Sequence, residues 1–298
     1  MPALILALNP SIDTEWRVDE VQWEEKNNVL SERRWAGGKG INVARWLKHL
    51  GGQPLLLVPL GGRTGAELAG YLRAEKIPTQ VVRLRESTRV NVIITTKAGR
   101  QMRFNPPGPL ISAVEWGRLL TAAKRELTRS DLLVLSGSLP RGLPVNTYAA
   151  LLRLAHRCGV KSLLDCDGPA FAAAVAERPF LVKPNLHELA QWWRKPLRTE
   201  AEIIRAARAL SQRIRGWVLV SRGAKRSLLL NDSEDSCSFV PPPRVKSRNT
   251  VGAGDALLAA VARAMQAGQP PATWLKAGVK AGSVAVQLDA GTLPGRSM

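Results

Sequence analysis

The sequence is poor in cysteine, histidine and long apolar stretches, and each shortage excludes a class of protein. Cys158, Cys166 and Cys237 form no CxxC pair and cannot all be joined in disulfides, so we interpret them as packing residues of a protein in a reducing, cytoplasmic compartment. No uncharged apolar stretch approaches the roughly 18 residues of a membrane helix. The apolar start, residues 1–8, lacks the basic residues of a signal peptide and is interpreted as a buried strand. No membrane association is therefore expected.

Three common site motifs are also missing. The Gly-Lys pair at 38–39 is followed by another glycine, so the G-x-x-x-x-G-K-[ST] pattern of P-loop proteins is absent. No G-x-G-x-x-G follows the first apolar segment, which disfavours a dinucleotide-dependent oxidoreductase. Gly137 and Ser138 are not part of a G-x-S-x-G elbow, and the histidines have no spaced partners, so a nucleophilic triad is disfavoured. We interpret the histidines as packing or solvated residues: His49, His156 and His187.

Acidic residues are scarce relative to basic ones, with 24 Asp and Glu against 43 Lys and Arg, for a formal net charge of +19. A nucleic-acid-binding surface is expected to gather its basic residues in a stripe or a tail. Here the basic residues are spread along the whole chain. We therefore expect no nucleic-acid partner. A general positive field still raises the local concentration of small anionic ligands.

Residues 249–256, Asn-Thr-Val-Gly-Ala-Gly-Asp-Ala, place a glycine pair and a carboxylate at the start of an apolar segment. The following residues, 257–262, carry no charge, which predicts a buried helix. The first turn of a helix leaves backbone N–H groups unpaired, and Gly252 and Gly254 let a phosphate approach them closely. Asp255 would then lie within reach of a hydroxyl that attacks the phosphate. Taken alone, the stretch is equally compatible with a loop whose Asp caps the helix.

The rest of the chain alternates short apolar runs with amphipathic segments. This pattern is typical of βαβ units and predicts an α/β fold with a mostly parallel sheet. Strands are predicted within 1–8, 53–60, 79–84, 131–135, 161–165, 180–182 and 217–220, and helices within 41–50, 64–75, 146–157, 186–193 and 199–215. Three pairs are spaced as capping boxes at helix starts: Thr64 with Glu67, Ser112 with Glu115, and Thr199 with Glu202.

Two segments interrupt this alternation. Residues 14–35 are polar and have no helical periodicity, and residues 89–104 have the pattern of a hairpin that turns at 98–100. We expect them to form a small exposed sheet, a lid inserted at about 14–35 and 87–105 of a single domain that spans 1–298.

Polar residues follow almost every predicted strand. In parallel sheets the carboxyl ends of the strands meet at one edge, where ligands bind. Several glycine turns, a lysine and carboxylates from both ends of the chain would meet there, which suits a pocket that handles phosphate. The segments are 9–13, 61–62, 136–138, 165–168, 183–185 and 221–223, with the turn at 252–255.

Residues 36–44, Ala-Gly-Gly-Lys-Gly-Ile-Asn-Val-Ala, together with 249–255 resemble the two signature motifs of the PfkB, or ribokinase-like, sugar kinase family. Residues 9–13, 137–140 and 183–189 are similar to the branch that contains 1-phosphofructokinase and tagatose-6-phosphate kinase. The resemblance covers nearly the whole chain. It implies an ATP- and Mg²⁺-dependent kinase with a doubly wound core, helices on both faces of the sheet, and a small β lid.

The resemblance also implies roles for individual residues. Asp255 would be the general base, and the N–H groups of residues 252–254 would form the anion hole for the migrating phosphoryl group. Asn185 and Glu188 would help to place Mg²⁺, through water molecules. The resemblance thus implies three sets of residues: catalytic Gly252, Ala253, Gly254 and Asp255; sugar-holding Asp13, Gly37, Gly38, Lys39, Asn42 and Ser138; and, on the nucleotide side, Lys183, Asn185, Ser221, Gly223, Gly252 and Gly254.

A phosphate already present on the substrate needs a cationic grip, and Arg89 and Arg103 on the two arms of the predicted hairpin are candidates. Each could instead be a solvated charge on an edge strand. The chain departs from the family where Asn28 stands in place of an arginine and where Arg226 replaces a glycine of the nucleotide loop. Arg226 would either contact ATP phosphates or distort that loop.

From these residues we predict a ketose-phosphate kinase, with fructose 1-phosphate as the first substrate to consider and tagatose 6-phosphate or fructose 6-phosphate as alternatives. A kinase for unphosphorylated sugars or nucleosides is the next alternative, and a catalytically silent sugar-phosphate-binding protein is the last. Because a lid of exposed strands has open edges, we also predict a homodimer joined through the lids.

Overall fold

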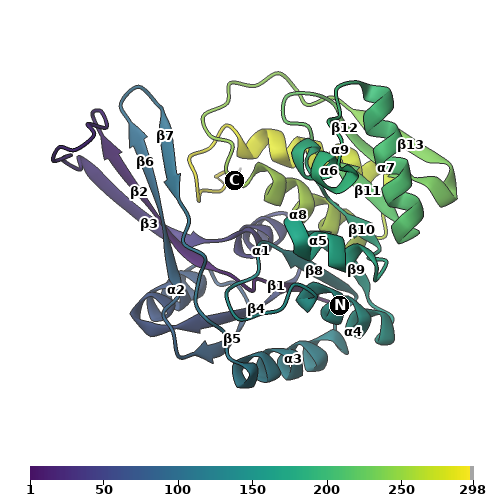
Figure 1. The fold of residues 1–298 in the computed structure, drawn as a ribbon, viewed down its shortest axis with the longest axis horizontal. Helices are drawn as coiled ribbons and strands as arrows, with labels where there is room; N and C mark the ends of the chain where they lie inside the picture. The colour runs from purple at the N-terminus through teal and green to yellow at the C-terminus, as the bar shows by residue number, and fades with distance from the viewer. Residues whose placement is uncertain (296–298) are drawn as a thin grey trace.

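The computed structural model describes residues 1–295, and the main sheet of this part of the chain has nine strands (Figure 1). Neighbouring strands are parallel from β5 through β11, and β12 and β13 continue the sheet antiparallel. In spatial order the strands are β13 (Ser236–Val240), β12 (Ser227–Asn231), β11 (Trp217–Val220), β10 (Leu181–Val182), β9 (Lys161–Asp165), β8 (Leu132–Ser136), β1 (Ala3–Leu6), β4 (Pro54–Gly61) and β5 (Thr79–Leu84).

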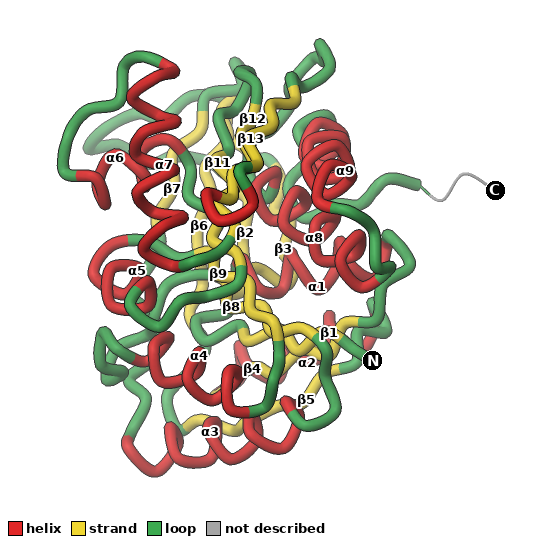
Figure 2. The backbone as a smooth tube through the Cα atoms, turned by 90° about the vertical axis from the view of Figure 1, so that its right-hand side faces the viewer, coloured by secondary structure: helices red, strands yellow, loops and turns green. Residues whose placement is uncertain are grey.

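Helices cover both faces of this sheet, as Figure 2 shows from the side. One layer holds α1 (Lys39–His49), α2 (Gly62–Ala74), α8 (Ala253–Gln266) and α9 (Pro271–Ala285). The other holds α3 (Ala113–Leu127), α4 (Thr147–Arg157), α5 (Gly168–Val175), α6 (Leu186–Trp193) and α7 (Glu200–Ile214). A short 3-10 helix, η1 (Asp232–Glu234), joins β12 to β13.

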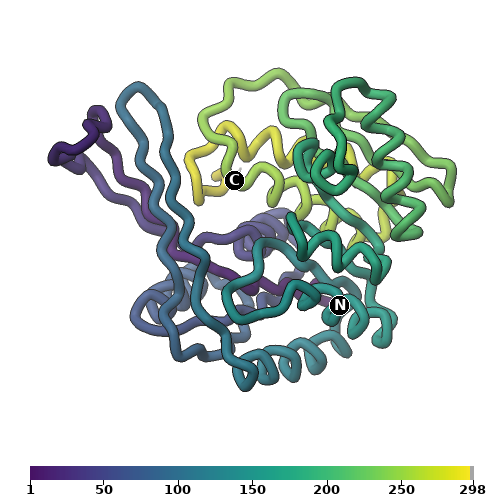
Figure 3. The backbone as a smooth tube through the Cα atoms, viewed as in Figure 1, coloured from purple at the N-terminus to yellow at the C-terminus, as the bar shows by residue number. Residues whose placement is uncertain are grey.

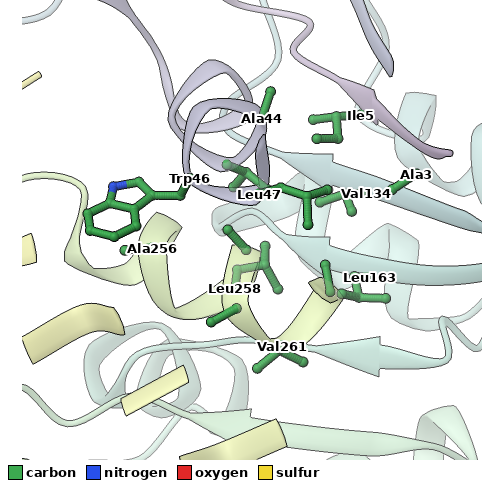
Figure 4. Close-up of a cluster of buried hydrophobic side chains, with 14 of the residues drawn as sticks. Ala3, Ile5, Ala44, Trp46, Leu47, Val134, Leu163, Ala256, Leu258 and Val261 are labelled. Carbon is green, nitrogen blue, oxygen red and sulfur yellow. The ribbon is translucent and has the colours of Figure 1, made fainter. Parts of the chain in front are cut away.

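Strand β1 shows why the core divides into two layers. Successive side chains of a strand point to opposite faces, so a strand buried on both faces reads as a continuous apolar run. Ala3 and Ile5 pack with the layer of α1 and α8, whereas Leu4 and Leu6 pack with the layer of α3 and α4. Figure 4 shows the first of these clusters, in which side chains of α1 and α8 pack beside Ile5. The doubly wound α/β fold is confirmed.

A second, four-stranded sheet extends away from the main sheet (Figure 1). Its order is β3 (Ser31–Gly37), β2 (Ser11–Val18), β6 (Arg89–Thr96) and β7 (Gln101–Phe104). We call it the small sheet. Figure 3 shows that its strands come from the first part of the chain, in the purple and blue colours. It forms from the predicted segments, but it begins at Ser11 and ends its second strand at Gly37, and residues 19–30 are a connection between strands.

Two of the three predicted capping boxes are confirmed, at Ser112 for α3 and at Thr199 for α7. The third is wrong: α2 begins at Gly62, before Thr64, and has no side-chain cap. The Thr64 hydroxyl instead donates to the carbonyl oxygen of Thr88, and Glu67 pairs with Arg34. Elements β12, β13 and α9 were not predicted. No helix in residues 1–295 has the length and apolar character to cross a membrane.

Candidate active site

A cavity of about 710 Å³ lies at the carboxyl ends of the parallel strands, next to the small sheet. The segments that follow β1, β8, β9, β10 and β11 all contribute to its wall, as the strand pattern predicted. Gly61 and Gly62, at the start of α2, do not line the cavity, because they lie against residues 84–87. The predicted site residues that line it are Asp13, Gly38, Lys39, Asn42, Arg89, Arg103, Ser138, Lys183, Asn185, Glu188, Ser221, Gly252, Gly254 and Asp255.

The start of α8 brings the glycine turn and the carboxylate together at this cavity. Gly252 is the N-cap residue of the helix and has a φ of 81°, a backbone conformation that favours glycine. Gly254 faces the Lys183 ammonium so closely that an added Cβ would lie 3.4 Å from its Nζ. Asp255 is buried, and its Oδ2 accepts a hydrogen bond of 2.8 Å from Asn42 Nδ2. The unpaired N–H groups of the first turn, a cation and a carboxylate therefore meet at one point.

The environment of Asp255 suits a proton acceptor. Burial raises the pKa of its carboxyl to about 6, and the nearby Asp165 charge adds to the rise. The hydrogen bond from Asn42 and the charges of Lys39 and Lys183 act in the opposite direction. A carboxyl with a pKa near 6 is mostly ionised at neutral pH and yet basic enough to accept a proton from an attacking hydroxyl.

Asp165 holds the two lysines of the site. The sequence placed its segment, residues 165–168, at the ligand-binding edge but did not single out Asp165 as a site residue. Its Oδ1 lies 3.2 Å from Lys183 Nζ and 3.4 Å from Lys39 Nζ, at the end of β9. Burial alone would raise the pKa of Asp165, but the two ammonium groups lower it below its usual value. The Asp165 charge is in turn the main reason that the pKa of Lys39 is raised. The Asp165 carboxylate and the Lys39 ammonium therefore stay ionised.

Asp13 is held in place by two hydrogen bonds to one oxygen. Ser11 Oγ donates to Asp13 Oδ1 over 2.7 Å, and Asn91 Nδ2 donates to the same atom over 2.8 Å. This leaves Oδ2 available to a sugar hydroxyl. Gly37 does not line the cavity, but its lack of a side chain makes room for Asp13, since an added Cβ would lie 2.1 Å from Asp13 Cγ.

We expect Gly37→Ala to raise the KM for the sugar substrate by roughly 5- to 150-fold, because the new methyl group overlaps the Asp13 carboxylate and overpacking of this kind costs about 1–3 kcal/mol. Gly117→Ala on α3 is the matched control, since its added Cβ meets no atom within 4 Å. Steady-state kinetics with varied sugar substrate measure the effect, and an unchanged KM in Gly37→Ala would refute the role of Asp13 in sugar binding.

The two arginines predicted to hold a phosphate differ in the hydrogen bonds that their guanidinium groups already make. The Arg89 guanidinium is already committed, because Nη1 donates to the carbonyl of Pro106 and Nη2 to that of Asn9. Arg103 lies on the cavity wall, is exposed, and makes one side-chain hydrogen bond, to Gln101 Oε1. Arg103 is thus the residue of the pair that can turn toward an anion without breaking backbone contacts.

A second cavity of about 610 Å³ adjoins the first and shares Ser221 and Gly254 with it. Its walls are mostly apolar and include Leu257, Val279 and Val286, which suits a flat, weakly polar ring system. Gly223 and Ala253 line it too. Of the predicted nucleotide-side residues, Lys183, Asn185 and Gly252 line the first cavity instead.

Arg226 lines neither cavity. Its guanidinium binds both oxygens of Glu200 at the start of α7 and stacks 4.4 Å from the ring centre of Phe239. The Glu200 carboxylate also binds Arg222. In the described part of the chain, Arg226 therefore braces the loop against α7 and β13, and a contact with nucleotide phosphates is not supported.

Asn185 and Glu188 form the capping box of α6, which the sequence did not predict for this pair. Glu188 Oε2 accepts from the Asn185 backbone N–H over 2.8 Å, while Oε1 lies 3.9 Å from Lys39 Nζ at the cavity. Residues 1–295 contain no group of three or more His, Cys, Asp or Glu side chains that could hold a metal ion. Mg²⁺ usually keeps several of its waters when it is bound by only one or two side chains, so Glu188 and Asn185 fit the role predicted for them.

A buried carboxylate with a raised pKa, paired lysines and free N–H groups at a helix start define a site for phosphoryl transfer to a hydroxyl. The chain belongs to the pfkB family of carbohydrate kinases, whose family model matches residues 8–294. The predicted family and enzyme class are thereby confirmed.

Individual relatives agree with the family assignment. The chain is 35% identical over 290 residues to the ATP-dependent 6-phosphofructokinase isozyme 2 of Escherichia coli, covering 96% of this chain and 93% of that protein. It is 31% identical to the 1-phosphofructokinase of Bacillus subtilis, covering 93% and 90%. The solved structure of the tetrameric inhibited form of phosphofructokinase-2 from Escherichia coli matches with a TM-score of 0.89 and 32% identity, covering 96% of this chain and 94% of that one.

Proposed function

We propose that this protein transfers the terminal phosphoryl group of ATP to a ketose phosphate, with fructose 1-phosphate as the substrate and fructose 1,6-bisphosphate and ADP as the products. The observation that carries the proposal is the position of Asp255 beside Lys183, Lys39 and the N–H groups at the start of α8. The adjoining cavity with apolar walls supports a site for the adenine ring. Both cavities meet at Gly254, where the phosphoryl group would pass.

In the proposed reaction the free hydroxyl of the sugar loses its proton to the Asp255 carboxylate and forms a bond to the terminal phosphorus of ATP. The bond from that phosphorus to the bridging oxygen breaks, and the electron pair leaves with ADP. Lys183 and the N–H groups of residues 252–254 stabilise the negative charge that develops on the phosphoryl oxygens. Asp13 holds a sugar hydroxyl through its free oxygen. Glu188 and Asn185 would hold a bound Mg²⁺ through its waters, and the ion would supply further positive charge to the phosphates.

Fructose 6-phosphate is the second candidate substrate, because one of the most similar relatives is named a 6-phosphofructokinase. We expect ADP release with Mg-ATP to be fastest with fructose 1-phosphate among fructose 1-phosphate, fructose 6-phosphate, tagatose 6-phosphate, fructose and ribose. The highest kcat/KM with fructose 6-phosphate would move the function to the second candidate. Turnover of free sugars alone would refute the ketose-phosphate assignment.

Arg103→Ala tests whether the hairpin arm holds the phosphate of the substrate. A charge-assisted hydrogen bond is worth about 1.5–3 kcal/mol, so the KM for the phosphorylated sugar should rise roughly 10–100-fold with little change in the KM for ATP. Arg100→Ala is the control, because Arg100 is exposed in the same hairpin and does not line the cavity. Equal KM values in Arg103→Ala and wild type would exclude this grip.

The small sheet also supports a proposed homodimer. Its edge strands are β3 and β7, and large apolar side chains are exposed on or beside it, with Trp23 77%, Leu30 60% and Phe104 51% accessible. Apolar exposure next to open edges favours pairing with a second copy. Light scattering at micromolar concentration should give twice the monomer mass, and a monomeric mass would count against the proposed dimer. The Escherichia coli relative was solved as a tetramer. A fourfold mass is therefore a third outcome, and it would also contradict a simple dimer. The three cysteines of this protein are all free, which supports the proposal of a cytoplasmic enzyme.

A further inference from the structure

A buried arginine, Arg45, is connected to the proposed catalytic base through one side chain, that of Asn42, and does not line the cavity of the active site. Arg45, on α1, is 5% exposed and donates from Nε and Nη2 to the two oxygens of Glu75 over 2.7 and 2.6 Å. Nη2 also donates to the carbonyl of Ala36 over 2.9 Å. Its remaining nitrogen, Nη1, lies 3.4 Å from Asn42 Oδ1. Every nitrogen of this side chain therefore has a partner, and one of the partners touches the active site.

The partner is Asn42, one helical turn before Arg45. A guanidinium carries donors and no acceptor, so the atom of Asn42 that faces Arg45 must be the amide oxygen. The amide nitrogen then points the other way, and it donates to Asp255 Oδ2 over 2.8 Å. Without Arg45 the amide could turn over, and its oxygen would then face the carboxylate oxygen of Asp255. Two facing acceptors favour a protonated carboxyl, which cannot act as a base.

We propose that Arg45, held by Glu75, is a positioning residue that fixes the orientation of the Asn42 amide so that Asn42 always donates to Asp255. The relay runs from Glu75 at the end of α2 through Arg45 and Asn42 on α1 to the base on α8. It keeps Asp255 ionised at neutral pH and leaves its other oxygen free for the substrate hydroxyl. The functional consequence rests on the proposed role of Asp255 as base, whereas the relay itself is a property of the folded protein.

Other charged groups also face Asp255 and would remain in place when Arg45 is changed. Asp165, the last residue of β9, raises the pKa of Asp255, whereas Lys39 on α1 and Lys183 after β10 lower it. The Arg45 charge also acts on Asp13, on β2, where it opposes the rise in pKa that burial causes. Because the three groups nearest to Asp255 are tied to one another through Asp165, their contribution should be the same in wild type and in an Arg45 variant.

The test is the pKa of Asp255 in Arg45→Met, measured by carbon-13 NMR titration of the carboxyl group without substrates, with Asp255→Asn used to assign the signal. We expect a rise of about one unit relative to wild type, the size expected for a lost hydrogen bond to a charged group. The acidic limb of the pH profile of kcat should move up by the same amount, with the KM for ATP unchanged. Arg34→Met is the matched control: Arg34 binds both oxygens of Glu67 in the same bidentate manner but does not contact Asn42.

Several outcomes decide the proposal. An Asp255 pKa in folded Arg45→Met equal to that of wild type, or an equal shift in Arg34→Met, would overturn it. If Arg45→Met does not fold, Glu75→Gln loosens the arginine without removing it and should raise the pKa of Asp255 by a smaller amount; no shift there would overturn the proposal as well. Full turnover by Asp255→Asn would refute the role of Asp255 as base without touching the relay, because the NMR titration needs no catalysis.

Discussion

Asp255→Asn should lower kcat by roughly 10²–10⁴-fold at pH 8, the range expected when a general base is removed. The amide cannot accept a proton from the sugar hydroxyl, but it has nearly the same size and can still pair with Asn42. The KM for ATP should change little, because the second cavity, which we propose for the adenine ring, does not include Asp255. Steady-state ADP release measures the loss. Asp131→Asn, a change at an exposed carboxylate that pairs with the N-terminus, is the control and should keep wild-type activity.

The same substitution should make the folded protein more stable at pH 8. Burial raises the pKa of Asp255 from 3.8 to about 6, so the folded state disfavours the ionised form. The sign follows from this: the contribution of Asp255 to stability is full below about pH 4 and is lost as the pH rises through about 6. The gain in Asp255→Asn at pH 8 should be of the order of 2–3 kcal/mol and should vanish near pH 4. Urea unfolding at the two pH values measures it. Loss of activity without this gain at pH 8 would indicate that Asp255 is not held in a strained ionised state.

Asp165→Asn should lower the free energy of unfolding more than any of the other substitutions, and it should also lower kcat strongly. The side chains of Asp165 and Lys183 are 1% and 5% exposed, so the change leaves a buried lysine without its counter-charge. Breaking a buried pair in this way costs about 3–5 kcal/mol. Lys183 also loses the anchor that holds it beside Gly254, where the phosphoryl group is proposed to pass, and kcat should fall by roughly 10²–10³-fold. Chemical denaturation and steady-state kinetics on the same protein measure the two effects.

A double variant separates the two roles of this pair. Asp165→Asn with Lys183→Met removes both buried charges and should recover most of the lost stability, because neither partner is left uncompensated. It should not recover activity, since the cation beside Gly254 is gone. Glu177→Gln, which breaks the exposed pair with Arg153, should cost at most about 1 kcal/mol and serves as the control. A double variant that is less stable than Asp165→Asn would contradict the ion-pair account.

Local features of the sequence predicted much of the fold and of the site. The apolar runs of β1 and β8 are buried on both faces and could be recognised without knowledge of their neighbours. The glycine turn at 252–254 and Asp255 are contiguous, so their meeting at a helix start follows from the order of residues alone. The capping pair at Ser112 was also found, because both of its hydrogen bonds lie within one turn.

Features that depend on contacts between distant segments could not be predicted. Asp165 meets Lys39 across a separation of 126 residues, and nothing in its own neighbourhood marks it as the partner of two lysines. Thr64 has the spacing of a cap, but its hydroxyl is bonded to the carbonyl of Thr88, and the N-cap of the helix is Gly61, three residues earlier. Arg89 reads as a free cation until the carbonyl groups of Asn9 and Pro106 are placed against it.

The identity of the product tests the central claim most directly. Purified protein is incubated with Mg-ATP and fructose 1-phosphate, and the mixture is followed by phosphorus-31 NMR, with Asp255→Asn in parallel. The account predicts that fructose 1,6-bisphosphate and ADP appear in equal amounts with wild type and that neither forms at a comparable rate with the variant. Release of inorganic phosphate without a bisphosphate, or equal rates of bisphosphate formation in the two proteins, would contradict it.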